Sequence, residues 1–282
     1  MDTILNINKP PGPSSFAVVA RVRRILNIKK AGHAGTLDPM ATGVLLILTG
    51  RATRLSQFLM GRPKEYLATI KLGIETDSCD LEGQIIRQCN VPEIARPQLL
   101  SALNEFTGDI RQIPPSFSAI KIDGQPAYKK ARQGKAVDIP ERQVRVDSID
   151  LVDLTADEIT IKVRCSKGTY IRSLARDIGQ RLGSCGTLVA LTRTAVGEFR
   201  LEQASELEGI TAQDGVSMDR ALAFMPEVII DSNGYQRTKH GNNIMVNEKG
   251  EKDIYYRIKY DGQLVALGQF KDDNQLHPEI VL

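Results

Sequence analysis

The stretch AGHAGTLDPMATGVLLIL, residues 31–48, changes within a few residues from a glycine-rich segment to an aliphatic one. Its first part, 31–43, has three glycines and a proline, which predicts a loop with tight turns. Its second part, 44–48, is an aliphatic run that predicts a buried strand. A short helix is expected near 51–60. The stretch therefore predicts a glycine-rich loop that leads directly into a core strand.

Asp38 is the single acidic residue between Asp2 and Glu65, and it lies in this loop just before Pro39. Because nearby cations favour a charged carboxylate, we expect its pKa to be lowered. An ionised carboxylate can act as a nucleophile or a base. The alternative is an Asp-Pro pair that only forms a turn. His33 is likewise either an acid–base group or a loop residue that makes hydrogen bonds.

The charges are unevenly spread along the 282 residues. The whole chain has 37 basic and 34 acidic residues, a net charge of +3. Residues 1–65 alone hold ten basic and three acidic residues, whereas residues 226–282 are slightly acidic. Two further basic clusters lie at 121–135 and 164–181. Concentrated positive charge predicts a surface for a polyanion, although solvated helix faces are the alternative for any single cluster.

The apolar spacing upstream of residue 225 alternates between helices and strands without a regular repeat. We expect an α+β body with a mixed, mostly antiparallel central sheet flanked by helices. In the last predicted helix, Arg172 and Arg176 share an exposed or site-facing side. The expected helices cover 15–27, 97–107, 125–133 and 170–182, and the expected strands begin at 66, 143 and 158.

After Pro226 the sequence consists of short runs of strand-forming residues at 228–231, 254–260 and 263–270, separated by Gly, Asn and Asp. This pattern predicts a small β domain, resembling a barrel, over 226–282. The first domain would then cover 1–225.

Several classes of protein are disfavoured. The longest aliphatic run is far too short to cross a bilayer, and no secretory signal is apparent, so we expect a cytoplasmic protein without a membrane partner. The four cysteines contain no C-x-x-C pair, which argues against zinc and a disulfide framework but leaves long-range pairing open. No nucleotide-binding glycine motif is present, so we expect no cofactor. Asp77, Asp80 and Glu82 form either a divalent-ion site or a polar turn.

Tyr66 and Tyr170 lie beside basic stretches. Aromatic rings next to cations suit a nucleic acid, because the ring stacks on a base while the cations hold phosphates. Half-buried packing is the alternative for either tyrosine alone.

Six segments together resemble one family. GHAGTLDPMATGVLLILTGRATRL at 32–55 resembles the active-site loop of the TruB-type tRNA pseudouridine synthases. In order along the chain, the other segments are KPPGPSSF at 9–16, KEYLATIKLGIETDSCDLEG at 64–83, QIPPSFSAIKIDGQPAYKKARQG at 112–134, CSKGTYIRSLARDIG at 165–179 and LTRTAVGEF at 191–199. The likeness covers about 1–200, and a weaker likeness to a PUA-type RNA-binding domain covers 228–282.

The resemblance implies an isomerase with the pseudouridine-synthase fold. It would flip uridine 55 out of the T loop of tRNA and convert it to pseudouridine without a cofactor or metal. It also implies a monomer of the stand-alone bacterial type. The roles that it implies are catalysis by Asp38, RNA contact by His33, stacking by Tyr66, pocket walls from Tyr170 and Leu191, pairing of Arg172 with Asp38, and support from Lys9.

Two positions depart from the family pattern. Ser14 replaces a common Thr and keeps the hydroxyl, whereas Thr192 replaces a common Arg and removes one cation. Two other classes compete with the synthase. A non-catalytic RNA-folding helper would not need Asp38 with its partners, and a metal-dependent nuclease would leave the 31–43 loop unexplained.

Overall fold

The computed structural model describes residues 1–118, 120–122, 124–127, 130, 133 and 139–282. The strands of its larger sheet are β1 (Thr3–Lys9), β2 (Ala31–His33), β3 (Thr42–Thr49), β4 (Lys64–Leu72), β7 (Gly108–Gln112), β10 (Arg142–Leu154), β11 (Glu158–Cys165), β12 (Gly186–Val196), β13 (Phe199–Arg200), β14 (Ser205–Glu206) and β15 (Gly215–Ser217). They run in the order β14-β1-β3-β12-β4-β11-β10-β7, with β13, β15 and β2 alongside. Most pairings are antiparallel, which confirms the predicted α+β class.

Helices pack on both faces of this sheet. Those of the larger body are α1 (Ser15–Ile25), η1 (Gly50–Leu55), α2 (Ser56–Met60), α3 (Arg96–Glu105), α5 (Ile171–Arg181), η2 (Leu201–Gln203), η3 (Ala212–Asp214) and α6 (Met218–Ala221). One core joins α1 and α5 to the same face of the sheet, and a second core lies on the opposite face under η1 and α2. No helix in the described residues is long and apolar enough to cross a membrane.

The sequence explains the elements that support the site. Ser14 caps α1 by accepting a hydrogen bond from the Ala17 amide at 3.2 Å, and Val18 and Val22 face the core. In β4, alternate residues from Tyr66 to Leu72 are buried, as the period of two predicts. Residues 31–33 form strand β2 rather than loop, because they pair with the end of β3.

Two of the predicted helices differ from the structure. In the helix predicted after Pro97, the apolar spacing places Leu100 on the same buried face as Leu99 and Leu103, but Leu100 is exposed, because α3 buries only a narrower stripe. The helix predicted at 125–133 lies largely outside the described residues. Short strands β8 (Lys121–Ile122) and β9 (Gln125–Pro126) occupy part of that region.

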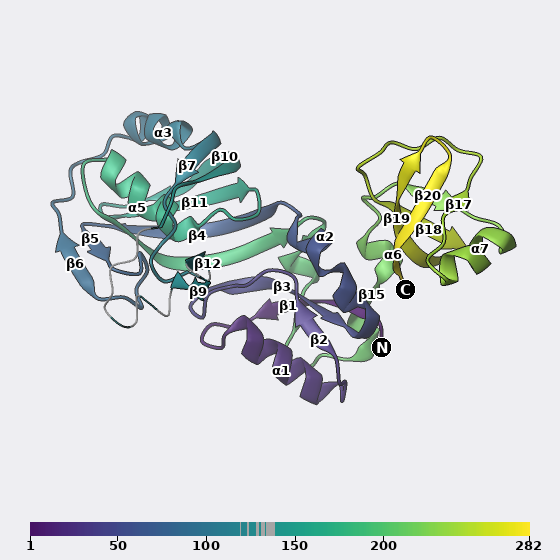
Figure 1. The fold of residues 1–282 in the computed structure, drawn as a ribbon. Helices are drawn as coiled ribbons and strands as arrows, with labels where there is room; N and C mark the ends of the chain where they lie inside the picture. The colour runs from purple at the N-terminus through teal and green to yellow at the C-terminus, as the bar shows by residue number, and fades with distance from the viewer. Residues whose placement is uncertain (119, 123, 128–129, 131–132, 134–138) are drawn as a thin grey trace.

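The larger sheet consists of two halves that meet at one short joint (Figure 1). β1 and β3 form the first half, and β12, β4, β11, β10 and β7 form the second. The halves are joined where β12 runs parallel to β3, in the register Thr192↔Thr42 and Arg193↔Gly43. The loop between β2 and β3 therefore faces the second half across this joint.

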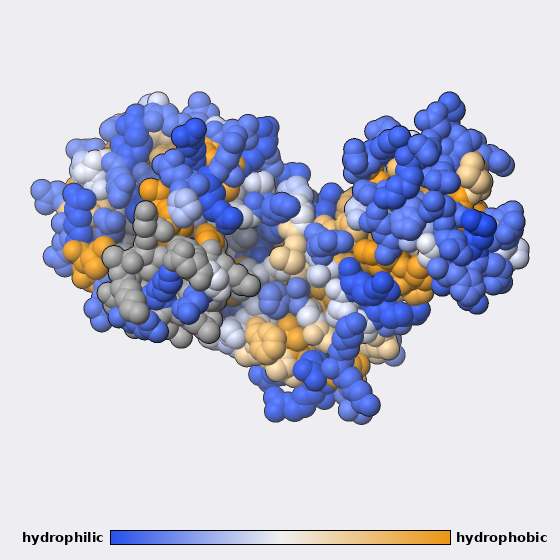
Figure 2. Space-filling view, in the orientation of Figure 1, coloured by the Kyte–Doolittle hydropathy of each residue, from blue (hydrophilic) through white to orange (hydrophobic). Residues whose placement is uncertain are grey.

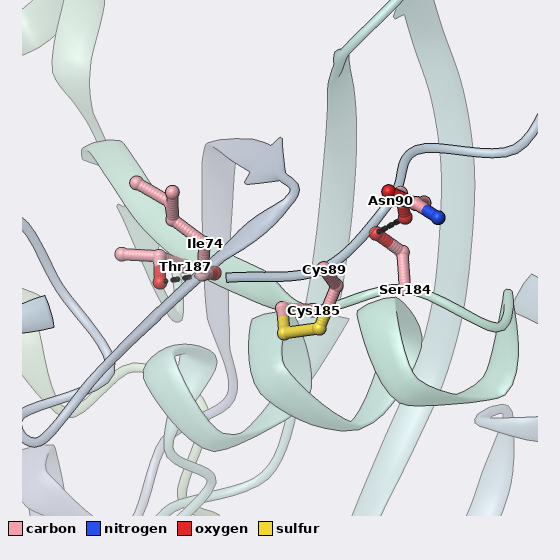
Figure 3. The surroundings of a disulfide bond; sticks show 6 residues. All are labelled: Ile74, Cys89, Asn90, Ser184, Cys185 and Thr187. Atoms are coloured by element: carbon pink, nitrogen blue, oxygen red, sulfur yellow. Dashed lines mark hydrogen bonds between the residues drawn. A yellow bond between two sulfur atoms is a disulfide. The ribbon is translucent and has the colours of Figure 1, made fainter. Parts of the chain in front are cut away.

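A hairpin of β5 (Ile74–Thr76) and β6 (Ile85–Gln88) packs against the start of β12. A disulfide joins Cys89 to Cys185, whose Cα atoms are 5.6 Å apart and whose sequence separation is 96 (Figure 3). The sequence argued against a disulfide framework but left long-range pairing open, and this bond is such a long-range pair, which only the folded chain brings together. The other cysteines, Cys79 and Cys165, are free and buried.

The C-terminal lobe has its own sheet and core. Its elements are β16 (Glu227–Ile229), α7 (Ser232–Lys239), β17 (Ile244–Met245), β18 (Tyr256–Tyr260), β19 (Gln263–Asp272) and β20 (Gln275–Val281), with the strand order β16-β18-β19-β20-β17. Three of these strands match the predicted runs. The curled sheet fits the predicted PUA-like fold, while the boundary at 225/226 stays a prediction.

Figure 2 shows a mostly hydrophilic face, with hydrophobic residues gathered over the β5–β6 hairpin and between the two lobes.

Candidate active site

A pocket opens at the joint between the two half-sheets. Asp38 comes from the β2–β3 loop, Tyr66 from β4, Leu191 from β12, and Tyr170 and Arg172 from the start of α5. All five line the pocket, with Thr36, Leu37, Thr169 and Ile171 completing it. The structure thus brings these five predicted site residues together from segments far apart in sequence.

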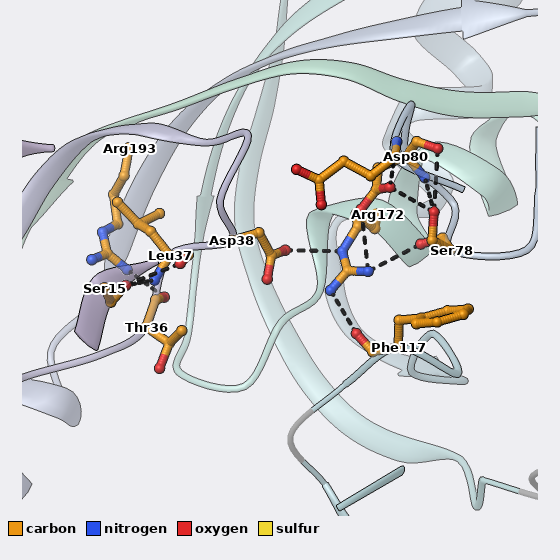
Figure 4. A network of polar contacts seen from close by, with 10 residues as sticks. Ser15, Thr36, Leu37, Asp38, Ser78, Asp80, Phe117, Arg172 and Arg193 are labelled. Carbon is orange, nitrogen blue, oxygen red and sulfur yellow. Dashed lines mark hydrogen bonds and ion pairs between the residues drawn. The ribbon is translucent and has the colours of Figure 1, made fainter. Parts of the chain in front are cut away.

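Arg172 forms the central ion pair of the pocket (Figure 4). Its Nε lies 2.9 Å from Asp38 Oδ2, as the resemblance implied, and its Nη1 lies 3.3 Å from Asp80 Oδ2. It also donates to the Ser78 and Phe117 carbonyl oxygens, each at 3.0 Å. The Arg172 side chain is only 6% exposed. Charge-assisted bonds in four directions therefore fix the guanidinium and aim it at Asp38.

The pKa of Asp38 is raised, not lowered as the local charge count predicted. Burial is the largest cause, and the Asp80 carboxylate adds to it, while Arg172 and Lys9 act in the opposite direction. The side chain keeps 38% of its surface accessible on the pocket side. Asp38 therefore bears a more basic carboxylate than an aspartate in water.

Lys9 lies beneath the loop rather than in the pocket lining. Its Nζ donates to the carbonyl oxygens of Pro10, Pro39 and Ala41 at 2.9, 3.0 and 2.8 Å. Burial lowers the pKa of this fully buried lysine to about 8, and Asp38 opposes that change. Two of these carbonyls flank Met40, just after Asp38, so Lys9 supports the site through the backbone.

The walls of the pocket are aromatic and apolar. Tyr66 is 9% and Leu191 8% exposed. The Tyr170 backbone is bonded twice to Gln112: its amide donates to Oε1 at 2.9 Å, and its carbonyl accepts from Nε2 at 3.0 Å. Burial raises the pKa of both tyrosines, so their hydroxyls stay protonated at neutral pH. The pocket offers flat, neutral surfaces beside one carboxylate.

His33 is not part of the pocket lining. Its Nδ1 is buried without a hydrogen-bond partner in the described part of the chain, and burial, followed by the charge of Arg193, lowers its pKa. A neutral imidazole is the result. The role of His33 in contacting RNA stays a prediction.

Asp80 and Arg193 are important residues that sequence reasoning missed. Asp80 was assigned to a metal site or a polar turn, but it is buried and bound to Arg172 and Ser78. The described residues contain no group of three or more His, Cys, Asp or Glu arranged for a metal. Arg193 lies at every second position of β12 with Leu191 and Ala195, and all three side chains are buried. This alternation along the strand is the sequence signal that could have indicated that Arg193 is buried.

Comparison with known proteins identifies the family of this chain. The model of the TruB family pseudouridylate synthases, N-terminal domain, matches residues 23–171. Proteins named tRNA pseudouridine synthase B from Francisella tularensis (strain FSC 198) and Francisella philomiragia are 50% and 44% identical over 96% of this chain and 91% of their own length.

Two solved structures of larger complexes show the same fold. A Cbf5-Nop10-Gar1 complex matches with a TM-score of 0.76 and 27% identity over 99% of this chain and 84% of that one. An H/ACA RNP bound to a substrate RNA matches with 0.75 and 26% over the same shares. By sequence and by fold, the chain belongs to the TruB family of pseudouridine synthases.

Proposed function

We propose that this enzyme converts uridine 55 in the T loop of tRNA to pseudouridine, with Asp38 as the catalytic group. The observation that carries the proposal is the ion pair of Asp38 with buried Arg172 at 2.9 Å, inside a pocket walled by Tyr66, Tyr170 and Leu191. The named relatives support tRNA as the substrate, and the excess of basic residues over 1–65 suits its phosphates.

The pocket fits a single extruded base. A uracil inside a folded loop is reached only after it leaves its stack, and an aromatic platform such as Tyr66 offsets part of the stacking it loses. Leu191 closes the apolar side, and Tyr170 closes another. The proposal thus assigns the walls to holding the flipped base and Asp38 to the chemistry.

The reaction needs one reactive carboxylate and no redox partner. The C1′–N1 bond breaks, the C1′–C5 bond forms, a proton leaves C5 and a proton is gained at N1, so the electrons balance. The raised pKa makes Asp38 a stronger base and nucleophile than a free aspartate. Arg172 holds this carboxylate in one orientation before the substrate arrives.

We further propose that the protein works as a cytoplasmic monomer.

Asp38→Asn tests the assignment. On an unmodified tRNA transcript, we expect pseudouridine at position 55 to fall at least a thousandfold while RNA affinity stays within a few-fold, because the substitution removes the reactive group and keeps the shape. Position-by-position detection of pseudouridine measures the first quantity and filter binding the second. Asp153→Asn, an exposed aspartate on β10, serves as the matched control and should be fully active.

The same assay separates the alternatives. A wild-type protein that binds tRNA without forming pseudouridine would be an RNA-folding helper. RNA shortened in a metal-dependent manner would indicate the nuclease. Modification at another uridine would overturn the position, and substantial turnover by Asp38→Asn would overturn the catalytic aspartate.

A further inference from the structure

Arg193 is a buried cation that binds backbone carbonyls. It is 1% exposed, and its guanidinium donates to the oxygens of Val44, Thr36 and Gly35 at 2.7, 3.2 and 3.1 Å. Figure 4 shows Arg193 beside Thr36 and Leu37. Among the described residues, no carboxylate lies within ion-pair distance of it. A buried charge without a counter-ion is costly, so its position calls for a specific explanation.

The three carbonyls lie on both limbs of the loop that carries Asp38. Gly35 and Thr36 precede Asp38, and Val44 follows it. A planar guanidinium has five N–H donors in fixed directions, so it holds several carbonyls at separations set by its own plane, whereas the three donors of an ammonium group rotate freely. Arg193 therefore fixes the width of the loop at its base.

Arg193 also lies at the joint of the two half-sheets. Its backbone is in register with Gly43 on β3 and with Tyr66 on β4. At Gly43, which has φ +96°, an added Cβ would lie 2.3 Å from the Arg193 carbonyl oxygen, so the approach of the two strands requires glycine there. The Arg193 charge also opposes the rise that burial causes in the pKa of Tyr66. One residue thus touches the loop and the aromatic wall.

We propose that Arg193 is a positioning residue that sets the place of Asp38 relative to Tyr66. It reaches Asp38 only through the loop backbone, and the pocket lining does not include it. Arg172 orients the carboxylate from the side of α5, whereas Arg193 fixes the backbone that presents it. This inference rests on the proposed function.

Arg193→Ala with chemical rescue tests the proposal. We expect the single-turnover rate at saturating T-stem-loop RNA to fall about 100-fold, the scale of a misplacement of about 1 Å, while the Kd for RNA changes less than about threefold. Ethylguanidinium at millimolar concentration should restore at least a tenth of the wild-type rate, because it can fill the cavity and donate to the same carbonyls. Arg193→Lys keeps the positive charge but lacks the planar set of N–H donors, and its rate should lie between those of the wild type and Arg193→Ala.

Arg257→Ala is the matched control. Arg257 is also buried and donates to a backbone carbonyl, but it lies on β18 in the C-terminal lobe and is paired with Asp219. We expect it to lower the melting temperature without lowering the rate at saturating RNA. A purely structural role for Arg193 would give the same pattern. Rates are therefore measured well below each variant's melting temperature and normalised to folded protein.

The outcomes separate the two proposals. If the wild type is active and Asp38→Asn is inactive, but Arg193→Ala stays within threefold of the wild type, only the positioning role is overturned. If Arg193→Ala does not fold, Arg193→Lys decides: a rate reduced at unchanged Kd supports the role, and a full rate overturns it. An inactive wild type overturns the proposed function instead.

Discussion

The two sides of the pocket are stabilised by different means, although each has a buried arginine at its centre. On the side of α5 and the hairpin, Arg172 is compensated by the carboxylates of Asp38 and Asp80. On the side of the β2–β3 loop, Arg193 donates to three backbone carbonyls instead, and Lys9 binds backbone carbonyls nearby. The first side is an ion-pair network, and the second is a backbone cradle.

The two sides therefore control different things: the ion pair with Arg172 orients the Asp38 carboxylate, and the bonds of Arg193 place the loop backbone that carries it. An ion pair depends on the protonation state of its partners, so the α5 side responds to the charge on Asp38. Carbonyl dipoles do not titrate, so the bonds of Arg193 hold the loop in the same place whether Asp38 is charged or neutral. A catalytic carboxylate that gains and loses charge during a reaction benefits from a support that is independent of that charge.

Breaking the ion-pair side should have the largest effect on stability. Arg172→Met leaves the buried Asp80 carboxylate without its cation, and we expect a loss of about 3–5 kcal/mol in the free energy of unfolding, together with loss of turnover. Urea unfolding measures the former. The double variant with Asp80→Leu should recover most of the stability and none of the activity. A single variant as stable as the wild type would contradict the network.

Opening the disulfide should come next. Cys89 and Cys185 tie the hairpin, whose turn carries Ser78 and Asp80, to the strand that follows α5. Cys89→Ser should cost about 2–4 kcal/mol, as expected for a cross-link closing a long loop. Unfolding with and without dithiothreitol provides the control, since reductant should lower the stability of the wild type and leave the variant unchanged. Equal stability of the oxidised wild type and the variant would show that the bond does not contribute.

Weakening the cradle should have a smaller effect. The Ser15 hydroxyl accepts from the Leu37 amide at 2.8 Å and donates to the Leu37 carbonyl at 2.9 Å. Ser15→Ala leaves both groups without this partner, and we expect a loss of about 1–3 kcal/mol with a few-fold fall in turnover. Ser14→Ala removes only the cap of α1 and should cost about 1 kcal/mol without changing turnover. Equal turnover of both variants would exclude the neighbouring loop bonds from catalysis.

The smallest effect concerns Asp38 and pH. Because the folded-state pKa of Asp38 is raised above 3.8, ionisation is less favourable in the folded protein, so its contribution to stability falls as pH rises through that pKa. Asp38→Asn should therefore be more stable than the wild type at pH 7, by less than about 1 kcal/mol because the side chain is partly open to solvent. The difference should close as pH falls toward 3.8. Thermal unfolding across pH 4–7 measures it, and a variant less stable at pH 7 would contradict the raised pKa.

The sequence predicted the parts of the molecule that depend on local patterns. Helix α1 and strand β4 follow from apolar periods of 3.6 and 2 and from a capping serine. The motif resemblance implied both the contact of Arg172 with Asp38 and the walls of Tyr66, Tyr170 and Leu191, and the structure places these residues around one pocket. The assigned roles of these residues remain predictions.

The parts that were missed depend on contacts across long stretches of chain. Ser78 and Arg172 are 94 residues apart, and no local pattern indicates that the Asp80 turn meets α5. The pKa of Asp38 was predicted in the wrong direction because counting charges along the sequence ignores burial and the distant Asp80. Cys89 and Cys185 were separated too far for their spacing to indicate a pair.

The short joint between the half-sheets has a consequence for synthesis of the protein. The hydroxyls of Thr42 and Thr192 meet there across 150 residues of sequence. At ribosomal rates, β12 emerges roughly 10–30 s after the loop that carries Asp38. During that interval Thr42 and Gly43, at the start of β3, lack their parallel partner, and the loop lacks both Arg172 and Arg193. The nascent N-terminal part thus carries Asp38 before any wall of its pocket exists, because β4, α5 and β12 are all synthesised later.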